Sequence, residues 1–190
     1  GIDDTDSPSG MCTTYISCLI IEKLKVCGYT IKGYPRLIRL NPFAPHKTRG
    51  NGAVSFKVEV QGEDEVENVK DVVLSLVSKF SELKNDDTNP GVVFYEGEIY
   101  DTLKRFALNA IRRILTIEDA RRLADKIGAE VYEYKNGRGI IGALAAIGCP
   151  LPDKTYELIA YRAPENYGKK RKIDKESVKR TDKETYPETF

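Results

Sequence analysis

Hydrophobic residues in the first half of the chain follow two different spacings. Steps of three and four residues, typical of an amphipathic helix, connect Ile16, Leu19, Ile20, Leu24 and Cys27, and then Val66, Val69, Val73, Leu76, Val77 and Phe80. Steps of two residues, typical of a strand with one solvated face, connect Val54, Phe56, Val58 and Val60. Further strands are expected at residues 1–2, 29–40 and 92–95. The order β-α-β-β-α-β predicts an α+β fold of the ferredoxin-like split βαβ type, with two helices on one face of an antiparallel sheet.

The second half of the chain begins with helices. Spacing is helical from about residue 99 to 128, and Thr116 with Asp119 forms a capping box that begins a second helix there. We interpret this segment as a helical connector. Residues 131–134, 140–147 and 156–161 then predict β-α-β, the first half of a second ferredoxin-like domain.

The expected domain organisation follows from these elements. Residues 1–128 form one module with its helical connector, and residues 129–190 form an incomplete ferredoxin-like domain with a basic tail. That tail, from Lys169 onward, contains the run 169–172 and has no apolar periodicity, so it cannot bury a core by itself. Gly1-Ile2 resembles the end of a strand whose start is absent, and we expect the chain to be a piece of a longer protein.

Composition excludes several classes of protein. With 41% hydrophobic and 31% charged residues, the chain is neither disordered throughout nor able to span a membrane, because its apolar runs are too short. Thirty basic and 29 acidic residues leave a net charge of +1, so binding of nucleic acid would depend on local patches. The four cysteines form no C-x-x-C pair and His46 is the single histidine, so we expect free thiols in a reducing cytosol and no zinc site.

Three carboxylates follow the first strand within four residues, namely Asp3, Asp4 and Asp6. Because they repel one another, their clustering favours a divalent cation such as Mg²⁺. The next helix begins near Thr13 and Thr14, where unpaired N–H groups suit a phosphate and Thr13 supplies a hydroxyl. The simpler alternative is that Asp6 or Ser7 is only a loop or cap residue.

The same aspartates invite comparison with haloacid dehalogenase phosphatases, whose motif has two aspartates one residue apart after an apolar strand. Asp4 and Asp6 have that spacing, but Pro8 stands where the motif requires Thr or Val. The comparison therefore fails.

A second candidate is the loop 41–52, which carries Lys47, Arg49 and Asn51 between prolines and glycines. Prolines stiffen such a loop and glycines let its backbone approach a ligand, so the cations are placed for phosphate. A solvated surface loop is the equal alternative, and His46 alone indicates only a loop residue.

A third candidate is the glycine-rich entry at residues 135–139, followed by the small and apolar run 139–148. It matches neither a Walker motif nor a dinucleotide fingerprint. Close packing of a buried helix is the favoured explanation of the run, while Arg138 remains available to touch a phosphate.

Several blocks together resemble the archaeal tRNA(Ile2) 2-agmatinylcytidine synthetases. They are Gly1 to Ser7, Gly10 to Tyr15, Pro35 to Pro42, Lys47 to Val54, Thr88 to Gly91, Gly139 to Gly148 and Thr155 to Arg162. The resemblance extends from Gly1 to Phe190. It implies a kinase-like ATP-binding module, a ferredoxin-like domain, and an enzyme that uses ATP to activate C2 of the wobble cytidine of tRNA(Ile2) for displacement by agmatine.

The resemblance also implies roles for individual residues. Thr13 matches the autophosphorylated threonine of the family, and Asp3, Asp4 and Asp6 match its catalytic, metal-binding acidic cluster. We assign Mg²⁺ to Asp4 and Asp6, and ATP to Thr14, Lys47, Arg49, Asn51 and Arg138. The family's OB-fold and zinc ribbon, which hold the tRNA, are absent from the sequence, so this chain is not expected to modify tRNA unaided.

Two alternatives stay open at this point. One is a non-catalytic RNA-binding module that uses Arg36, Arg39, Lys47, Arg49 and the run 169–172. The other is a Mg-dependent phosphatase. The sequence does not show which aspartate binds the metal and which acts as a base. Equal candidates for the agmatine pocket are Glu157, Tyr161 and residues after Phe190.

Overall fold

Two compact units, Gly1–Pro150 and Leu151–Phe190, make up this computed structural model. The structure describes residues 1–47, 50–155 and 175–187. The expected strand at 156–161 and the basic run 169–172 lie outside these residues. None of the described helices has the length and apolar character that crossing a membrane requires.

The first unit is built on a five-stranded sheet with order β2-β3-β1-β4-β5, in which every neighbouring pair is antiparallel. The strands are β1 (Ile2–Asp3), β2 (Ile31–Arg39), β3 (Gly52–Val58), β4 (Gly91–Phe94) and β5 (Glu130–Glu133). Pro35 lies in the edge strand β2, where the register shifts between Lys32 and Arg36. An edge strand accommodates proline because it does not need every N–H for the ladder.

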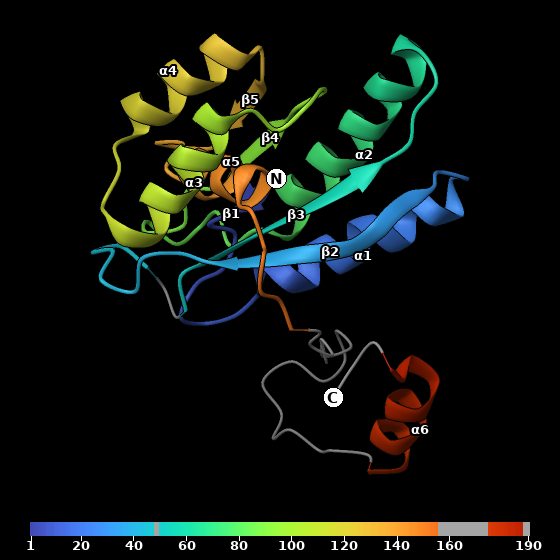
Figure 1. The fold of residues 1–190 in the computed structure, drawn as a ribbon. Helices are drawn as coiled ribbons and strands as arrows, with labels where there is room; N and C mark the ends of the chain where they lie inside the picture. The colour runs from blue at the N-terminus through green and yellow to red at the C-terminus, as the bar shows by residue number, and fades with distance from the viewer. Residues whose placement is uncertain (48–49, 156–174, 188–190) are drawn as a thin grey trace. The chain divides into compact units, whose positions relative to one another are not determined.

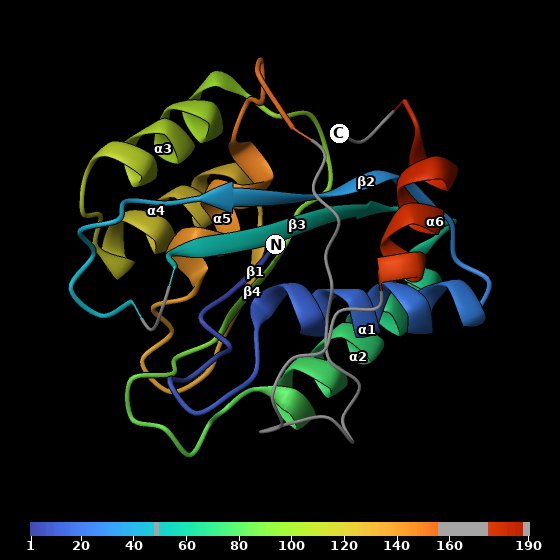
Figure 2. The same ribbon diagram turned by 90° about the horizontal axis from the view of Figure 1, so that it is seen from below.

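Helices cover both faces of this sheet, as Figure 2 shows. On one side lie α1 (Thr13–Val26) and α2 (Glu63–Phe80), and on the other lie α3 (Asp101–Arg112), α4 (Ile117–Ile127) and α5 (Ile140–Gly148) (Figure 1). Between the sheet and the first pair of helices, Ile2, Ile16, Ile20, Leu24, Val69, Val73, Val77 and Val92 form a buried core. The predicted helices and the predicted strand are thus confirmed, and their apolar residues pack against one another in one core.

The predicted capping box is present at the start of α4. The Thr116 hydroxyl accepts the N–H of Asp119 at 3.1 Å, and the Asp119 carboxylate accepts the N–H of Thr116 at 3.1 Å. Gly128 ends the helix in the left-handed conformation, at φ 68°.

The segment expected to begin a second ferredoxin-like domain lies, as far as Pro150, in the compact unit Gly1–Pro150. Residues 130–133 form β5, which pairs with β4 at the edge of the same sheet, from Gly91 opposite Glu133 to Phe94 opposite Glu130. The helix α5 is almost wholly buried and contacts β1, β3 and β4. A helix without a polar face needs apolar neighbours on all sides, and the sheet together with α3 and α4 provides them.

The described part of the second unit contains one helix, α6 (Lys175–Thr185), which the sequence pattern did not predict. Its residues are mostly charged and exposed, and Glu176 forms an ion pair with Lys179 at 3.0 Å, one turn away. Side-chain pairs of this spacing stabilise a helix that has no core of its own.

Candidate active site

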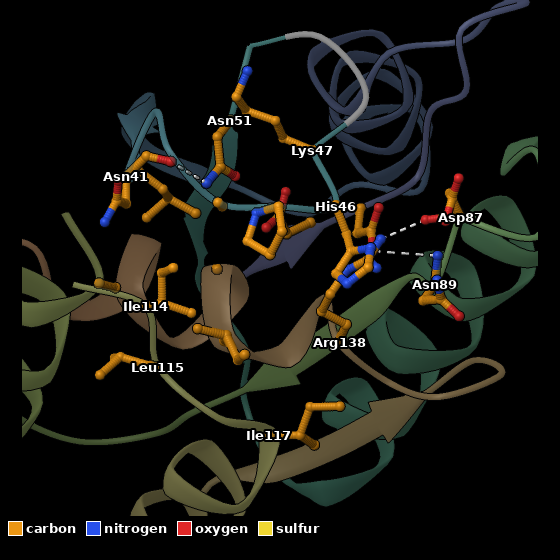
Figure 3. Close-up of a pocket in the computed structure, with 18 of the residues that line it drawn as sticks. Asn41, His46, Lys47, Asn51, Asp87, Asn89, Ile114, Leu115, Ile117 and Arg138 are labelled. Carbon is orange, nitrogen blue, oxygen red and sulfur yellow. Dashed lines mark hydrogen bonds and ion pairs between the residues drawn. The ribbon is translucent and has the colours of Figure 1, made fainter. Parts of the chain in front are cut away.

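A pocket of about 480 Å³ lies where β1 ends (Figure 3). Its lining comes from the loop after β1, the β2–β3 loop, the loop before β4, the α3–α4 linker and the start of α5. Of the residues that the sequence singled out, six line it: Asp3, Asp4, Asp6, Lys47, Asn51 and Arg138. The fold therefore brings the acidic cluster together with cations from two distant segments.

Asp4 is the centre of the polar contacts in this pocket. At φ 58°, its backbone is in the left-handed region, where the chain turns directly after β1. One carboxylate oxygen, Oδ2, accepts Nη2 of Arg138 at 2.7 Å and Nε at 3.0 Å. The same oxygen accepts the backbone N–H of Asn89 at 3.3 Å. The two charged side chains are only 11% and 21% exposed, so this ion pair is largely removed from water.

Burial changes the acidity of the cluster. Desolvation, with the repulsion of Asp4 next in importance, raises the pKa of Asp3 to about 8. Burial also raises the pKa of Asp4 to about 6, against the opposing effect of Arg138. Both carboxyl groups hold protons more tightly than an ordinary aspartate does. A cation bound beside them would stabilise the charged forms and release those protons.

Asn89 holds three segments of the pocket in place. Besides the bond from its backbone to Asp4, its side chain donates to the carbonyl of Asp86 at 3.4 Å and accepts the N–H of Asn136 at 3.4 Å. The guanidinium of Arg138 also donates to the carbonyl of Asp87. The loop before β4 and the loop before α5 are thereby tied to the end of β1.

Glycines allow α5 to reach this site. A Cβ at Gly142 would stand 1.9 Å from Oδ2 of Asp3, and one at Gly139 would stand 2.2 Å from the backbone nitrogen of Gly91. Neither side chain would fit without movement of the helix. The interpretation of the glycine and alanine run as close packing is confirmed, and the start of α5 packs directly beside an aspartate of the cluster.

The β2–β3 loop is held by Asn41. Its side-chain oxygen accepts the backbone N–H of Phe43 at 2.9 Å. Its own backbone N–H donates to the carbonyl of Ala110 at 3.1 Å. Asn51 donates from Nδ2 to the carbonyl of Asn41 at 2.8 Å. These bonds fix both ends of the loop segment that carries Lys47 to the pocket (Figure 3). Thr48 and Arg49 lie outside the described residues.

Comparison with known proteins gives matches along the whole chain. The family model of the TiaS TCKD domain matches residues 1–136, and that of the TiaS FLD domain matches residues 137–190. The chain belongs to the TiaS family. It is 50% identical over 190 residues to the tRNA(Ile2) 2-agmatinylcytidine synthetase TiaS of Pyrococcus horikoshii, covering all of this chain and 44% of that protein.

Two crystal structures of TiaS proteins are similar to this fold. One is the TiaS-tRNA(Ile2)-ATP complex, with a TM-score of 0.85 and 48% identity over 100% of this chain and 45% of that chain. The other is the TiaS-tRNA(Ile2)-AMPCPP-agmatine complex, with a TM-score of 0.83 and 46% identity over the same shares of the two chains. The chain thus spans less than half the length of the TiaS proteins that it matches.

The boundary between the two TiaS family models passes through the pocket. The TCKD model covers the aspartates, Lys47 and Asn51, whereas Arg138, Ile141 and Gly142 fall in the segment matched by the FLD model. In the structure all of them belong to the unit Gly1–Pro150. The pocket of this TiaS chain is therefore completed by residues that follow the TCKD match.

Thr13 and Thr14 occupy a different position from the other candidates. Thr13 is the buried first residue of α1, and its hydroxyl lies 3.0 Å from that of Thr5. The Thr14 hydroxyl lies 2.9 Å from the sulfur of Cys12. Neither threonine is among the described residues that line the pocket.

The carboxylates suit a cation that arrives with phosphate. Within residues 1–47, 50–155 and 175–187, no three His, Cys, Asp or Glu side chains are arranged to hold a metal ion by themselves. Magnesium in nucleotide sites needs only one or two protein carboxylates, since phosphates and water complete its shell. Asp3 and Asp6 line the pocket beside Asp4, so the donor set fits Mg²⁺ shared with a nucleotide rather than a cage made by protein alone.

Several lining residues were missed by sequence reasoning. Asp86 and Asp87, in the loop between α2 and β4, were not among the candidates, and His46 also lines the pocket. The linker residues Ile114 and Leu115 were assigned to a connector. The available signal was a pair of apolar residues placed just before the capping box, where a solvated linker has no need of them.

The structure also shows what one of the basic residues named for the RNA-binding alternative contacts. Arg36 donates from Nη2 to the carbonyl of Cys149, at the end of α5. Its guanidinium therefore has a structural partner within the first unit. This contact gives no support to a continuous basic surface along β2.

Proposed function

We propose that this chain is the ATP-binding and phosphoryl-transfer part of a tRNA(Ile2) 2-agmatinylcytidine synthetase. The observation that carries the proposal is the pocket that joins Asp3, Asp4 and Asp6 to Lys47 and Arg138. Support also comes from the names of the relatives and from TiaS structures described as complexes with tRNA(Ile2), ATP and agmatine.

The proposed reaction has two steps. The γ-phosphoryl group of ATP is transferred to O2 of the wobble cytidine, forming an O–P bond while the terminal bond of ATP breaks. The neutral primary amine of agmatine then attacks C2 and forms a C–N bond, the C2–O2 bond breaks so that phosphate leaves with O2, and the nitrogen releases a proton to solvent. Phosphoryl transfer requires positioning and charge neutralisation more than covalent chemistry by the protein, which matches a pocket made of carboxylates and cations.

The proposed roles are of two kinds. Some side chains balance the charge of the phosphates or hold the cation, and others position a loop or the acceptor group. Lys47 and Arg138 neutralise the phosphates, while Asn51 fixes the end of the loop that carries Lys47. Asp4 and Asp6 would hold Mg²⁺, which supplies charge neutralisation on the phosphate oxygens when it is bound. Asp3 remains to orient the acceptor, and Arg49 would extend the phosphate contacts from the same loop.

Thr13 is retained as the proposed phosphate acceptor of the protein itself, with Thr14 beside it at the start of α1. The N-terminal end of a helix favours an anion, which suits a phosphothreonine there. Because the Thr13 hydroxyl pairs with that of Thr5, phosphorylation requires this buried pair to open.

The ferredoxin-like description of the module is also part of the proposal. The order β2-β3-β1-β4, with α1 after β1 and α2 after β3, supports it. The strand β5 would then be an addition at the edge of that arrangement.

A chimera tests the proposal in the context that the reaction requires. Residues 1–190 are joined to the remaining part of the Pyrococcus horikoshii relative, and labelled agmatine, ATP and tRNA(Ile2) are supplied. We expect label in the tRNA, and none when the chimera carries Asp4→Asn. A chimera that folds and binds tRNA but incorporates no agmatine, beside an active intact relative, contradicts the proposal.

A further inference from the structure

Three successive residues, Asp4, Thr5 and Asp6, form an acidic turn, and the segment between α2 and β4 is bonded to each of them. The backbone N–H of Glu82 donates to the carbonyl of Thr5 at 3.0 Å. The hydroxyl of Thr88 donates to the carbonyl of Asp6 at 2.8 Å. A backbone N–H of the same segment reaches the carboxylate of Asp4 at 3.3 Å. The position of the acidic turn therefore depends on a segment about 80 residues away in the chain.

The bond from Thr88 is the one of these three that depends on the identity of a side chain. Glu82 and Asn89 use their backbone N–H groups, which every residue except proline has. Thr88 is 0% exposed and is absent from the described lining of the pocket, so its hydroxyl cannot touch a ligand there. A buried hydroxyl lowers stability when it has no hydrogen-bond partner, and here the partner is the carbonyl of Asp6.

The carbonyl that Thr88 holds belongs to the peptide plane between Asp6 and Ser7. The other polar group of this plane, the N–H of Ser7, donates to the carbonyl of Gly10 at 3.0 Å. Because a peptide unit is planar, bonds at its two edges restrict its orientation, and with it the direction in which the Asp6 side chain leaves the backbone. Asp6 lines the pocket beside Asp4. The bond from Thr88 therefore bears on how the two carboxylates are placed.

We propose that Thr88 is a positioning residue for Asp6. Its hydroxyl holds the peptide plane after Asp6, so that the Asp6 carboxylate stays in the pocket beside that of Asp4. This inference rests on the proposed function, in which these two aspartates hold Mg²⁺ shared with ATP. It adds a residue outside the pocket on which the geometry of the pair depends. Side chains that orient metal ligands act in this way on metal affinity without touching the metal.

Binding of the ATP analogue AMPCPP to the 190-residue chain at increasing Mg²⁺ concentrations tests the inference. Thr88→Val keeps the shape of the side chain and removes its hydroxyl. We expect the Mg²⁺ concentration that gives half of the maximal gain in affinity to rise about tenfold. Affinity in EDTA should stay at the wild-type value, because Lys47 and Arg138 still neutralise the phosphates. Thr88→Ser retains the hydroxyl and should restore the wild-type Mg²⁺ dependence.

Ser55→Ala is the matched control. Ser55 is 5% exposed, and its hydroxyl donates to the carbonyl of Ala146 at 2.7 Å, 91 residues away in the chain. The variant loses the same kind of buried bond, but Ser55 is absent from the described lining of the pocket. Thermal melts should show a lower melting temperature for both Ser55→Ala and Thr88→Val, whereas the Mg²⁺ dependence should change only in Thr88→Val. If the valine variant does not fold, Thr88→Cys, a weaker donor of similar size, should shift the Mg²⁺ dependence in the same direction.

Agmatine incorporation by the chimera described above gives a second readout. At limiting Mg²⁺ the chimera with Thr88→Val should be about tenfold slower than the unsubstituted chimera, and saturating Mg²⁺ should restore its rate. A partly unfolded population would lower the rate by the same factor at every Mg²⁺ concentration. The dependence on Mg²⁺ therefore distinguishes a positioning role from a loss of folded protein.

The other outcomes overturn the inference in distinguishable ways. A wild-type Mg²⁺ dependence in Thr88→Val removes the positioning role, while AMPCPP binding by the wild type leaves the proposed function intact. An equal shift in Ser55→Ala would mean that lost stability, and not the placement of Asp6, changes the Mg²⁺ dependence. A wild-type chain that does not bind AMPCPP at any Mg²⁺ concentration contradicts the proposed function and the inference together.

Discussion

Gly142 lies so close to Asp3 that a Cβ at this position would stand 1.9 Å from the carboxylate oxygen Oδ2. The same Cβ would stand 2.9 Å from Cδ1 of Leu40. The absence of a side chain at Gly142 therefore sets the distance between α5 and the end of β1. One glycine in a helix determines how closely that helix approaches the acidic cluster.

Gly142→Ala is expected to displace either α5 or the Asp3 side chain. Overpacking of this kind costs roughly 1–3 kcal/mol, so the free energy of unfolding should fall by that amount. ATP binding should weaken as well, because the aspartate moves. Gly10→Ala is the control, since its Cβ would meet nothing closer than Glu82 Oε1 at 3.7 Å. Chemical denaturation of both variants measures the difference, and equal stabilities would contradict the close contact.

The ion pair between Asp4 and Arg138 can be tested with a double-mutant cycle, in which the stabilities of the single variants and the double variant are compared. Arg138→Gln leaves a largely buried aspartate without its cation, and this loss costs up to about 3–5 kcal/mol in buried pairs. Arg138→Lys should recover only part of the stability, because lysine cannot donate two bonds in the same geometry. Adding Asp4→Asn to Arg138→Gln removes the unpaired charge and should restore stability without restoring ATP turnover. Additive destabilisation in the double variant would show that the two side chains are not coupled.

The ion pairs of Lys70 lead to a prediction of how the free energy of unfolding depends on pH. The Lys70 side chain is only 11% exposed, and its ammonium pairs with Glu130 of β5 and lies 2.7 Å from Oε1 of Glu67. The bond from Lys70, and then that from Tyr132, lowers the pKa of Glu130 below its ordinary value of 4.5. A lowered carboxyl pKa contributes stability above 4.5, and that contribution is lost as the pH falls through the lowered value.

Glu130→Gln checks this dependence. The variant should melt at a lower temperature than the wild type at neutral pH, and the difference should shrink as the pH falls below 4.5. The substitution keeps the size of the side chain and removes its charge. A difference in melting temperature that stays constant across this range would contradict the role of the pair.

Local spacing was sufficient to predict most elements of the fold. Ile16, Ile20 and Leu24 recur at helical steps because one side of α1 faces the sheet, and they are buried as expected. The capping box of Thr116 and Asp119 was readable because all its partners lie within four residues. Both are properties of short segments.

Long-range pairing could not be predicted in the same way. Val131 and Tyr132 indicate a strand, but nothing in their pattern states which sheet they join, and the structure places them beside β4. Likewise Asp87 and Ile114 reach the pocket only because loops far apart in sequence converge there. The aspartates were recognised because three carboxylates in four residues are costly without a counter-charge.

Asp4→Asn in this chain tests the central claim most directly. Asparagine tolerates the left-handed backbone at φ 58° and retains an oxygen that can accept from Arg138, so the fold should persist by circular dichroism. With γ-labelled ATP and Mg²⁺, we expect the wild type to transfer label and the variant to be slower by on the order of a hundredfold. Mapping with a Thr13→Ala variant locates the acceptor. A folded Asp4→Asn chain that transfers phosphate at the wild-type rate would contradict the assignment of this pocket as the phosphoryl-transfer site.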